Sequence, residues 1–338
     1  MMFRRGGRLR AAVGEFETAV RAQDGAAAER AFGGLHRAFG RAGDAELLEA
    51  GPRLAAFLGE VPPGPRAVTA VMIGACVERG ADAVASAPAV FAGAREAFEA
   101  AEVFCERWAA TGGGDLPGHE DDDLTEADVE RVGYDAVVGW ESLPQWEMAC
   151  VAMLNAKAVR REAGGKRELR AVVERVRETS GEPFKCLAYA LDVLDDEPLV
   201  VLDRKTGAGF VVRVSGIGDN FQLHTLLADA LIGGGHLPGA APSVQAAAMC
   251  RDQPGMSPTT GSFNLVGADG EWIWNEGNPS EIPLVDGVRI VVLDPPSYER
   301  SWPAGRFFPG MTGELVLERV LTGSEAAALL VQVAESVR

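Results

Sequence analysis

The residues of this chain best suited to covalent chemistry are one cysteine and one histidine, in the order that a thiol enzyme uses. Cys186 is predicted in the first turn of a helix, where unpaired amide groups and the helix dipole favour a thiolate. His224 follows later, with Asp219 close to it in sequence, so a Cys-His-Asp arrangement is one hypothesis. It would make the protein an enzyme of the thiol hydrolase, acyl-transfer or peptide-tailoring type.

The competing interpretation of the same residues is structural. Cys186 stands on a helix that needs apolar residues for packing, and a buried cysteine behaves as a small hydrophobe. His224 is itself predicted on a helix, whereas the papain-like arrangement places its base on a strand. The sequence therefore leaves open whether the protein is an enzyme.

A dense group of polar residues surrounds His224 and predicts a binding site between a strand and a helix. Its other members are Ser215, Asp219, Asn220 and Gln222. Gly216 and Gly218 resemble a phosphate-binding turn, but Phe221 stands where a dinucleotide motif has its third glycine. The alternative is helix capping by Asp219 or Asn220, with Gln222 and His224 exposed.

Two tryptophans give a third candidate site. Trp272 and Trp274 lie two positions apart in a predicted strand, so both point to one face, and Asn275 and Glu276 follow in a polar turn. Paired indole rings either stack on a ligand or fill a core. The first case would make the chain a small-molecule binding protein. The arginines that would accept a carboxylate or an acidic peptide in this half are Arg289, Arg300 and Arg306.

Cofactor and metal motifs are lacking in the sequence. The four histidines are isolated, and the acidic run 119–123 lacks the spacing and the glycine turn of a calcium loop. There is no P-loop, no zinc pattern and no Gly-x-Ser-x-Gly motif. We therefore expect no cofactor and no metal ion.

The elements that must position these residues change in character near residue 195. Before it, apolar residues recur at helical spacing, as in Leu9, Val13, Phe16 and Val20. We expect a helical bundle or irregular helical array over residues 1–195, with an acidic, Gly-rich linker near 111–124. After it come alternating strands, hairpins and a C-terminal helix, which predict a mainly antiparallel α+β domain over 196–338. The fold class is thus α+β.

Composition limits the partners. The net charge of −17 repels nucleic acid and anionic membranes, and no apolar stretch is long enough to span a bilayer. The N-terminal arginines Arg4, Arg5, Arg8 and Arg10 form either a local basic patch or a solvated terminus. Five cysteines without a pairing pattern favour a reducing, cytoplasmic location.

The leading expectation is a soluble, acidic protein that recognises a protein or peptide as an accessory or scaffold factor. Its charge suits a basic or neutral partner. The thiol enzyme and the small-molecule binding protein are the alternatives. The identity of the partner and the oligomeric state stay open.

Overall fold

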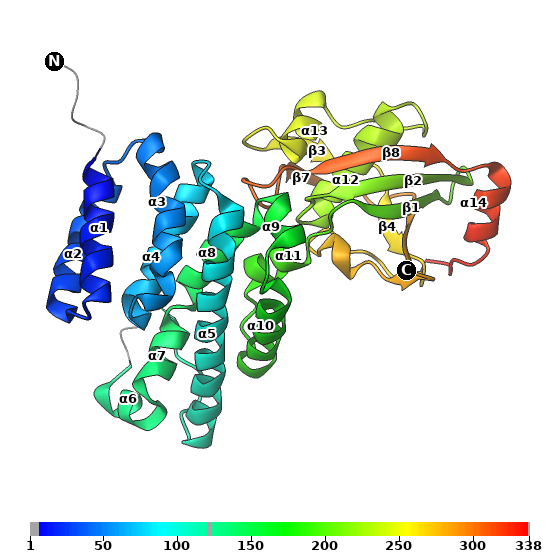
Figure 1. The fold of residues 1–338 in the computed structure, drawn as a ribbon. Coiled ribbons are helices and arrows are strands. Elements are labelled where there is room, and N and C mark those ends of the chain that lie inside the picture. Colours follow the sequence, from blue (N-terminus) through cyan, green and yellow to red (C-terminus); the bar gives the residue numbers. More distant parts are fainter. Residues whose placement is uncertain (1–6, 120–123, 337–338) are drawn as a thin grey trace, which may run out of the picture. The chain divides into compact units, whose positions relative to one another are not determined.

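The chain has an α+β fold, as the sequence predicts (Figure 1). The computed structural model describes residues 7–119 and 124–336. It divides into two compact units, Met1–Leu191 and Asp192–Arg338, so the division lies close to residue 195. No helix among the described residues is both long and apolar enough to cross a membrane.

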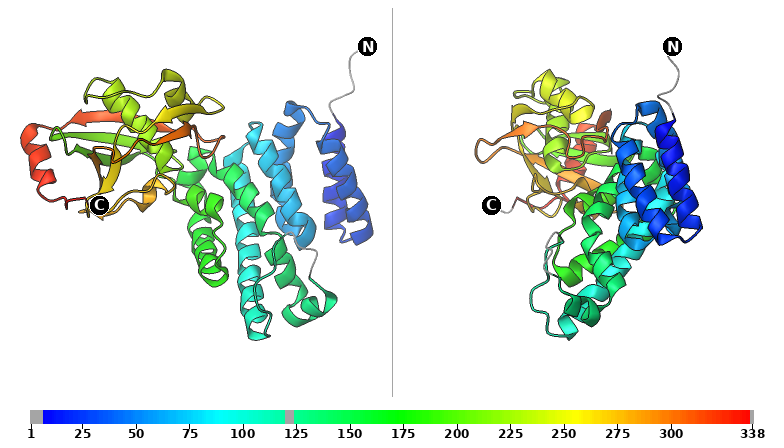
Figure 2. Two further views of the ribbon diagram at one scale, coloured as in Figure 1. Left: turned by 180° about the vertical axis from the view of Figure 1, so that it is seen from behind. Right: turned by 90° about the vertical axis from the view of Figure 1, so that its left-hand side faces the viewer.

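The first unit is an array of helices packed side by side (Figures 1 and 2). The central member is α5, which packs against α3, α7, α8 and α10. In chain order the elements are α1 (Arg8–Arg21), α2 (Gly25–Phe39), α3 (Asp44–Phe57), the 3-10 turn η1 (Leu58–Glu60), α4 (Pro63–Glu78), α5 (Ala83–Ala110), α6 (Glu126–Val132), α7 (Tyr134–Glu141), α8 (Leu143–Leu154), α9 (Lys157–Glu162), α10 (Lys166–Ser180) and α11 (Lys185–Asp192).

Apolar stripes explain most of these helices. All four stripe residues of α1 are buried, which confirms the helix predicted from their spacing. A proline-rich segment, residues 61–65, leads into a helix. α4 begins at Pro63, because proline is well suited to the first helical turn, where its missing N–H costs nothing. Pro52 and Pro88 lie inside α3 and α5 without ending them.

Tryptophans hold the Gly-rich segment that follows α5. Trp108 Nε1 donates to the carbonyl of Asp115, at 3.1 Å, and Trp140 Nε1 donates to that of Pro117, at 3.1 Å. The His119 ring lies 4.2 Å from the Trp140 ring, measured between centroids. The described part of the predicted linker is therefore packed against the helices, while residues 120–123 lie outside the described residues.

The second unit is built around a mixed sheet. Its path is β4-β6-β1-β2-β8, with β5 also paired to β6, and β3 and β7 form a separate pair. In chain order the elements are β1 (Glu197–Asp203), β2 (Ala208–Ser215), α12 (Asn220–Ala228), the π turn η2 (Asp229–Gly233), α13 (Val244–Arg251), β3 (Ser257–Thr260), β4 (Asn264–Gly267), the 3-10 turn η3 (Pro279–Glu281), β5 (Leu284–Val285), β6 (Val288–Asp294), β7 (Ser301–Ala304), β8 (Glu314–Val320) and α14 (Gly323–Leu330).

The sheet is mainly antiparallel, as predicted, with one parallel pair between β1 and β6. Alternate residues of each strand face two separate cores. Leu199, Val201 and Leu293 pack with α12 and α13 on one face, whereas Leu202 and Val292 pack with α14 on the other. Helices therefore cover both faces of the sheet, and α12 is the helix that carries the predicted polar site.

Two parts of this unit differ from the sequence prediction. The sequence shows no clear sign of α13 or of the β3–β7 pair. The predicted strand over 271–275 is reduced to one bridge, between Val266 and Trp272. The reason lies in the next residues, whose carbonyl groups turn towards α12 instead of continuing the sheet.

Candidate functional site

The N-terminus of α12 is closed by its own chain. Asp219 caps the helix, because its side chain accepts from the N–H of Gln222 at 2.8 Å. The N–H of Asn220 donates to the carbonyl of Gly277 and that of Phe221 to the carbonyl of Asn275, at 2.9 and 3.1 Å. These amide groups are the ones that a phosphate at a helix N-terminus would need. They are already used, so the geometry does not favour a phosphate here.

Several polar side chains of this region are buried and join elements together. Gln222 accepts from the N–H of Gly218 at 3.0 Å and donates to the carbonyl of Cys250 at 2.7 Å. The Asn220 side chain donates to the carbonyl of Trp274, at 2.9 Å. Ser215, at the end of β2, donates to Asp195 at 2.9 Å. Gln222 was expected to be exposed if it had no function, and its burial corrects that expectation.

His224 lies in the core of the second unit, with 1% of its surface exposed. Its ring stacks on Phe263, with centroids 4.5 Å apart, and meets Trp302 edge-on at 4.9 Å. Nε2 accepts from the N–H of Ser262 at 3.1 Å, so the proton of the neutral ring is on Nδ1. The interpretation of His224 as an exposed residue is therefore wrong.

The surroundings of His224 keep the ring neutral. Burial is the main cause that lowers the pKa of the imidazole, and the charge of Arg300 adds to it, whereas Asn275 acts in the opposite direction; together they bring the pKa to about 3. A general base needs a pKa near the working pH. Such a low pKa makes His224 a weak base at neutral pH, and its stacking fixes the ring in the core.

Cys186 has an environment unlike that of an activated thiol. It is exposed and stands at the start of α11, where the Glu147 carboxylate accepts from the N–H of Leu187 at 2.9 Å. Partial burial raises the pKa of the thiol, Glu147 raises it further, and Lys185 opposes them. The hypothesis of a Cys186–His224–Asp219 site joins residues of two different units and stays a prediction.

A pocket of about 700 Å³ lies beside Trp272 in the second unit. We call it the tryptophan pocket. Its lining residues are Arg204, Lys205, Asn264, Trp272, Asp294, Pro295, Ser297, Glu335 and Ser336. Arg204 is paired with Asp294 at 2.7 Å, whereas exposed Lys205 has no ion pair with any described residue. Among its lining residues the pocket therefore offers an aromatic wall and one available cation, whereas the Asn264 amide is already hydrogen-bonded within the protein.

Exposed aromatic residues extend from this pocket over the surface. Trp274 is 66% exposed and its ring lies 6.1 Å from that of Trp272, between centroids. Tyr298 is 57% exposed. The Arg300 guanidinium carbon is 6.0 Å from the Trp272 ring centroid and 5.6 Å from that of Tyr298, within reach of a cation–π contact. We call Trp272, Trp274, Tyr298 and Arg300 the aromatic cluster.

Arg300 connects the aromatic cluster to the core. Its Nη2 donates to Asn264 Oδ1 at 2.7 Å and to the carbonyl of Phe263 at 3.3 Å. Phe263 is the residue on which His224 stacks. The other two arginines considered from the sequence hold loops, because Arg289 donates to the Ile282 carbonyl and Arg306 to those of Met311 and Gln253.

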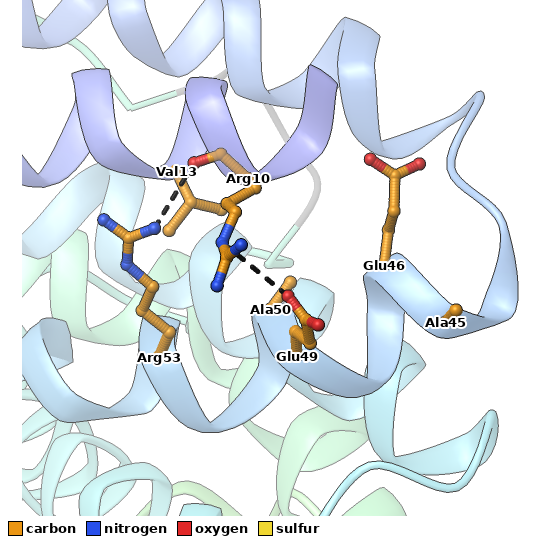
Figure 3. A pocket seen from close by; sticks show the side chains of 7 residues that line it. All are labelled: Arg10, Val13, Ala45, Glu46, Glu49, Ala50 and Arg53. Carbon is orange, nitrogen blue, oxygen red and sulfur yellow. Dashed lines mark hydrogen bonds and ion pairs between the residues drawn. The ribbon is translucent and has the colours of Figure 1, made fainter. Parts of the chain in front are cut away.

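The first unit has a pocket of about 570 Å³ between α1 and α3 (Figure 3). Arg10 reaches across it to Glu49, with Nε and Oε2 3.7 Å apart. Arg53 donates to the Arg10 carbonyl at 3.3 Å and pairs with Glu17 at 2.8 Å. The charges at this pocket are thus engaged within the protein, which gives it a structural role in joining the two helices.

Sequence reasoning named Trp272, Trp274 and Arg300 but missed three residues beside them. Lys205 lies in a hairpin turn, Asn264 begins β4 and Tyr298 follows the Pro295-Pro296 pair, so no local pattern joins them. Glu276 is exposed next to buried Asn275. The described residues contain no group of three or more His, Cys, Asp or Glu side chains that would hold a metal ion.

Comparison with known proteins adds no relative, since the chain matches no protein-family model, no curated protein and no solved structure.

Proposed function

We propose that this protein recognises peptide segments of a partner through the tryptophan pocket and the aromatic cluster of its second unit. The supporting observation is Trp274, a tryptophan that leaves 66% of its surface exposed beside a pocket with a second indole wall. Burial of a large aromatic side chain is strongly favourable, so a tryptophan left on the surface is suited to an interface.

The composition of the cluster supports binding of a partner. Residues that contribute most to interface affinity are enriched in Trp, Tyr and Arg, which are the residue types present here. The pocket of about 700 Å³ has room for one anchoring side chain and its neighbours. Lys205 would receive a carboxylate, either of an acidic side chain or of the C-terminus of the peptide.

A peptide fits the cluster better than a compact small molecule does. Trp274 and Tyr298 do not line the tryptophan pocket, yet they continue the aromatic surface beyond it. A ligand that contacts them as well as Trp272 has to extend across the surface. The net charge of −17 favours a segment that is neutral or basic overall, with an apolar anchor next to its single carboxylate. Because all five cysteines are free, we place this recognition in the cytoplasm.

The test is selection of peptides from a random library against the immobilised full-length protein, followed by measurement of Kd for the enriched sequences. Trp274→Ala should weaken these peptides by about tenfold or more, as expected for an interface hot spot. Met256→Ala is the matched control, because Met256 is 68% exposed and belongs neither to the pocket nor to the cluster. Equal binding by wild type and Trp274→Ala would refute the proposal.

A small-molecule site is the second candidate, because Trp272 lines the pocket. The two candidates make different predictions for the two tryptophans. A compact ligand inside the pocket depends on Trp272 and Lys205 but not on Trp274, whereas a peptide depends on both tryptophans. Kd values for Trp272→Leu and Trp274→Leu therefore separate them.

A further inference from the structure

Three arginines whose side chains have no partner among the described residues line another pocket of the first unit. The pocket has a volume of about 480 Å³ and is lined by Arg8, Arg37, Ala38, Arg41 and Glu46. We call it the arginine pocket. Arg8 is the first residue of α1, Arg37 lies in the last turn of α2, and Arg41 lies in the connection to α3. The start of α1 and the end of α2 with the connection that follows it thus bring three positive charges to one pocket.

The clustering is unusual because nearly all other arginine side chains in the described chain have partners. Only four arginines of residues 7–119 and 124–336 make no side-chain hydrogen bond, ion pair or ring contact, and these are Arg8, Arg30, Arg37 and Arg41. Three of these four line the arginine pocket. In a chain with 49 acidic residues, a shortage of carboxylates does not explain this.

In the pocket between α1 and α3, by contrast, the arginines have acidic partners. There, Arg10 and Arg53 both pair with glutamates, as Figure 3 shows for Arg10 and Glu49. Glu46 lines both pockets, but its Oε1 accepts from the N–H of Leu9 at 3.2 Å, and it forms no ion pair with the described arginines. The arginine pocket therefore carries three guanidinium groups against one carboxylate that is already engaged.

The helix dipole explains the position of only one of the three arginines. Arg37 lies near the C-terminus of α2, where a positive charge is favourable. Arg8 lies at the N-terminus of α1, where the helix dipole is positive and a cation is unfavourable. The first turn of α1 contains no acidic residue, and the Glu46 carboxylate that accepts from the N–H of Leu9 is the one acidic group among the residues lining this pocket. Placing Arg8 there is favourable once a bound anion faces both the helix end and the arginines.

We propose that the arginine pocket binds a phosphate-class oxyanion that carries two or more negative charges. Guanidinium groups form paired hydrogen bonds with phosphate oxygens, which favours arginine over lysine in such sites. Three arginines suit more than one phosphate group, so pyrophosphate is the appropriate probe. The site lies in the first unit and is independent of the peptide site in the second.

The experiment is isothermal titration of the full-length protein with sodium pyrophosphate at low salt. The expected result is saturable binding that weakens by about fivefold or more in each of Arg8→Gln, Arg37→Gln and Arg41→Gln. Arg30→Gln is the matched control, because Arg30 is an exposed, unpaired arginine of α2 outside the pocket. Its affinity should stay within about twofold of wild type, since it adds only distant charge.

Three outcomes would overturn the proposal. They are the absence of saturable pyrophosphate binding to the wild type, an equal loss in Arg30→Gln, and unchanged affinity in the variant that combines all three substitutions. Titration with succinate tests the ligand class, because a dicarboxylate bound as tightly as pyrophosphate would rule out selectivity for phosphate. Thermal unfolding of each variant confirms that it is folded at the temperature of titration, and glutamine keeps most of the side-chain length.

Discussion

The network at α12 and the aromatic cluster are neighbouring regions with opposite relations to solvent. Around α12, Asn220, Gln222 and His224 are each about 1% exposed and join the helix to loops and to α13. In the aromatic cluster, Trp274 and Tyr298 leave more than half of their surfaces exposed. Both regions are rich in residue types that carry function, yet only the aromatic cluster presents those side chains to solvent.

The difference between the two regions shows how burial decides what a polar or aromatic residue does. A buried histidine is held by its neighbours and loses its charge, so it contributes to stability. An exposed tryptophan contributes little to stability and is available for binding. Arg300 touches both regions, through Phe263 and through Trp272, so the scaffold fixes the position of the cluster.

The largest effect is expected from His224→Ala. The substitution removes a buried ring between Phe263 and Trp302 and leaves the N–H of Ser262 without its acceptor. We expect the free energy of unfolding to fall by roughly 2–5 kcal/mol. Chemical denaturation measures this loss. The control is His236→Ala, which changes an exposed histidine of the same unit and should cost about 0.5 kcal/mol or less.

If His224→Ala unfolds at the same denaturant concentration as wild type, His224 does not belong to the core. The claim that the network at α12 is a buried scaffold would then be wrong, and the contrast with the exposed aromatic cluster would no longer hold.

The pH dependence of stability gives the next effect. Because the folded state holds His224 neutral with a pKa of about 3, the unfolded chain binds more protons between that value and its ordinary pKa near 6.5. Stability is therefore fully present above the unfolded pKa and falls as the pH drops below it. The slope from this residue is about 1.4 kcal/mol per pH unit. Unfolding curves of wild type and His224→Gln between pH 7 and pH 4 test it, since carboxylate contributions are common to both.

A smaller effect is expected at the cap of α12. Asp219→Ala removes the acceptor for the N–H of Gln222 and should cost about 1 kcal/mol. Asp252→Ala changes an exposed aspartate just after α13 and serves as the control. Asp219→Asn should keep most of the stability, because asparagine also caps helices. A loss of several kcal/mol in Asp219→Asn would show that the charge, and not the cap, is what matters at this position.

Much of the fold follows from the sequence because local patterns determine it. The four-residue stripe of α1 and the β1–β2 hairpin both depend on near neighbours in the chain. The parallel pairing of β1 with β6 joins strands about ninety positions apart, and the β3–β7 pair is also distant. No local pattern specifies such contacts, so they were not predicted.

The candidate site was predictable in its residue types but not in their exposure. The sequence placed Trp272 and Trp274 on one face, but period-2 spacing does not tell whether that face is covered. The alternative of helix capping alone had Gln222 and His224 exposed, as polar residues usually are. Their burial depends on Phe263, Trp302 and α13, which are distant in sequence.

The most direct test of the account is the affinity of library-selected peptides for wild type and for Trp274→Ala. Trp274 is mostly exposed, so the variant should keep its free energy of unfolding within about 0.5 kcal/mol. The account predicts that Kd rises by about tenfold or more in this folded variant, while Met256→Ala binds as wild type does. A folded Trp274→Ala protein with unchanged Kd would contradict the claim that the aromatic cluster is the recognition surface.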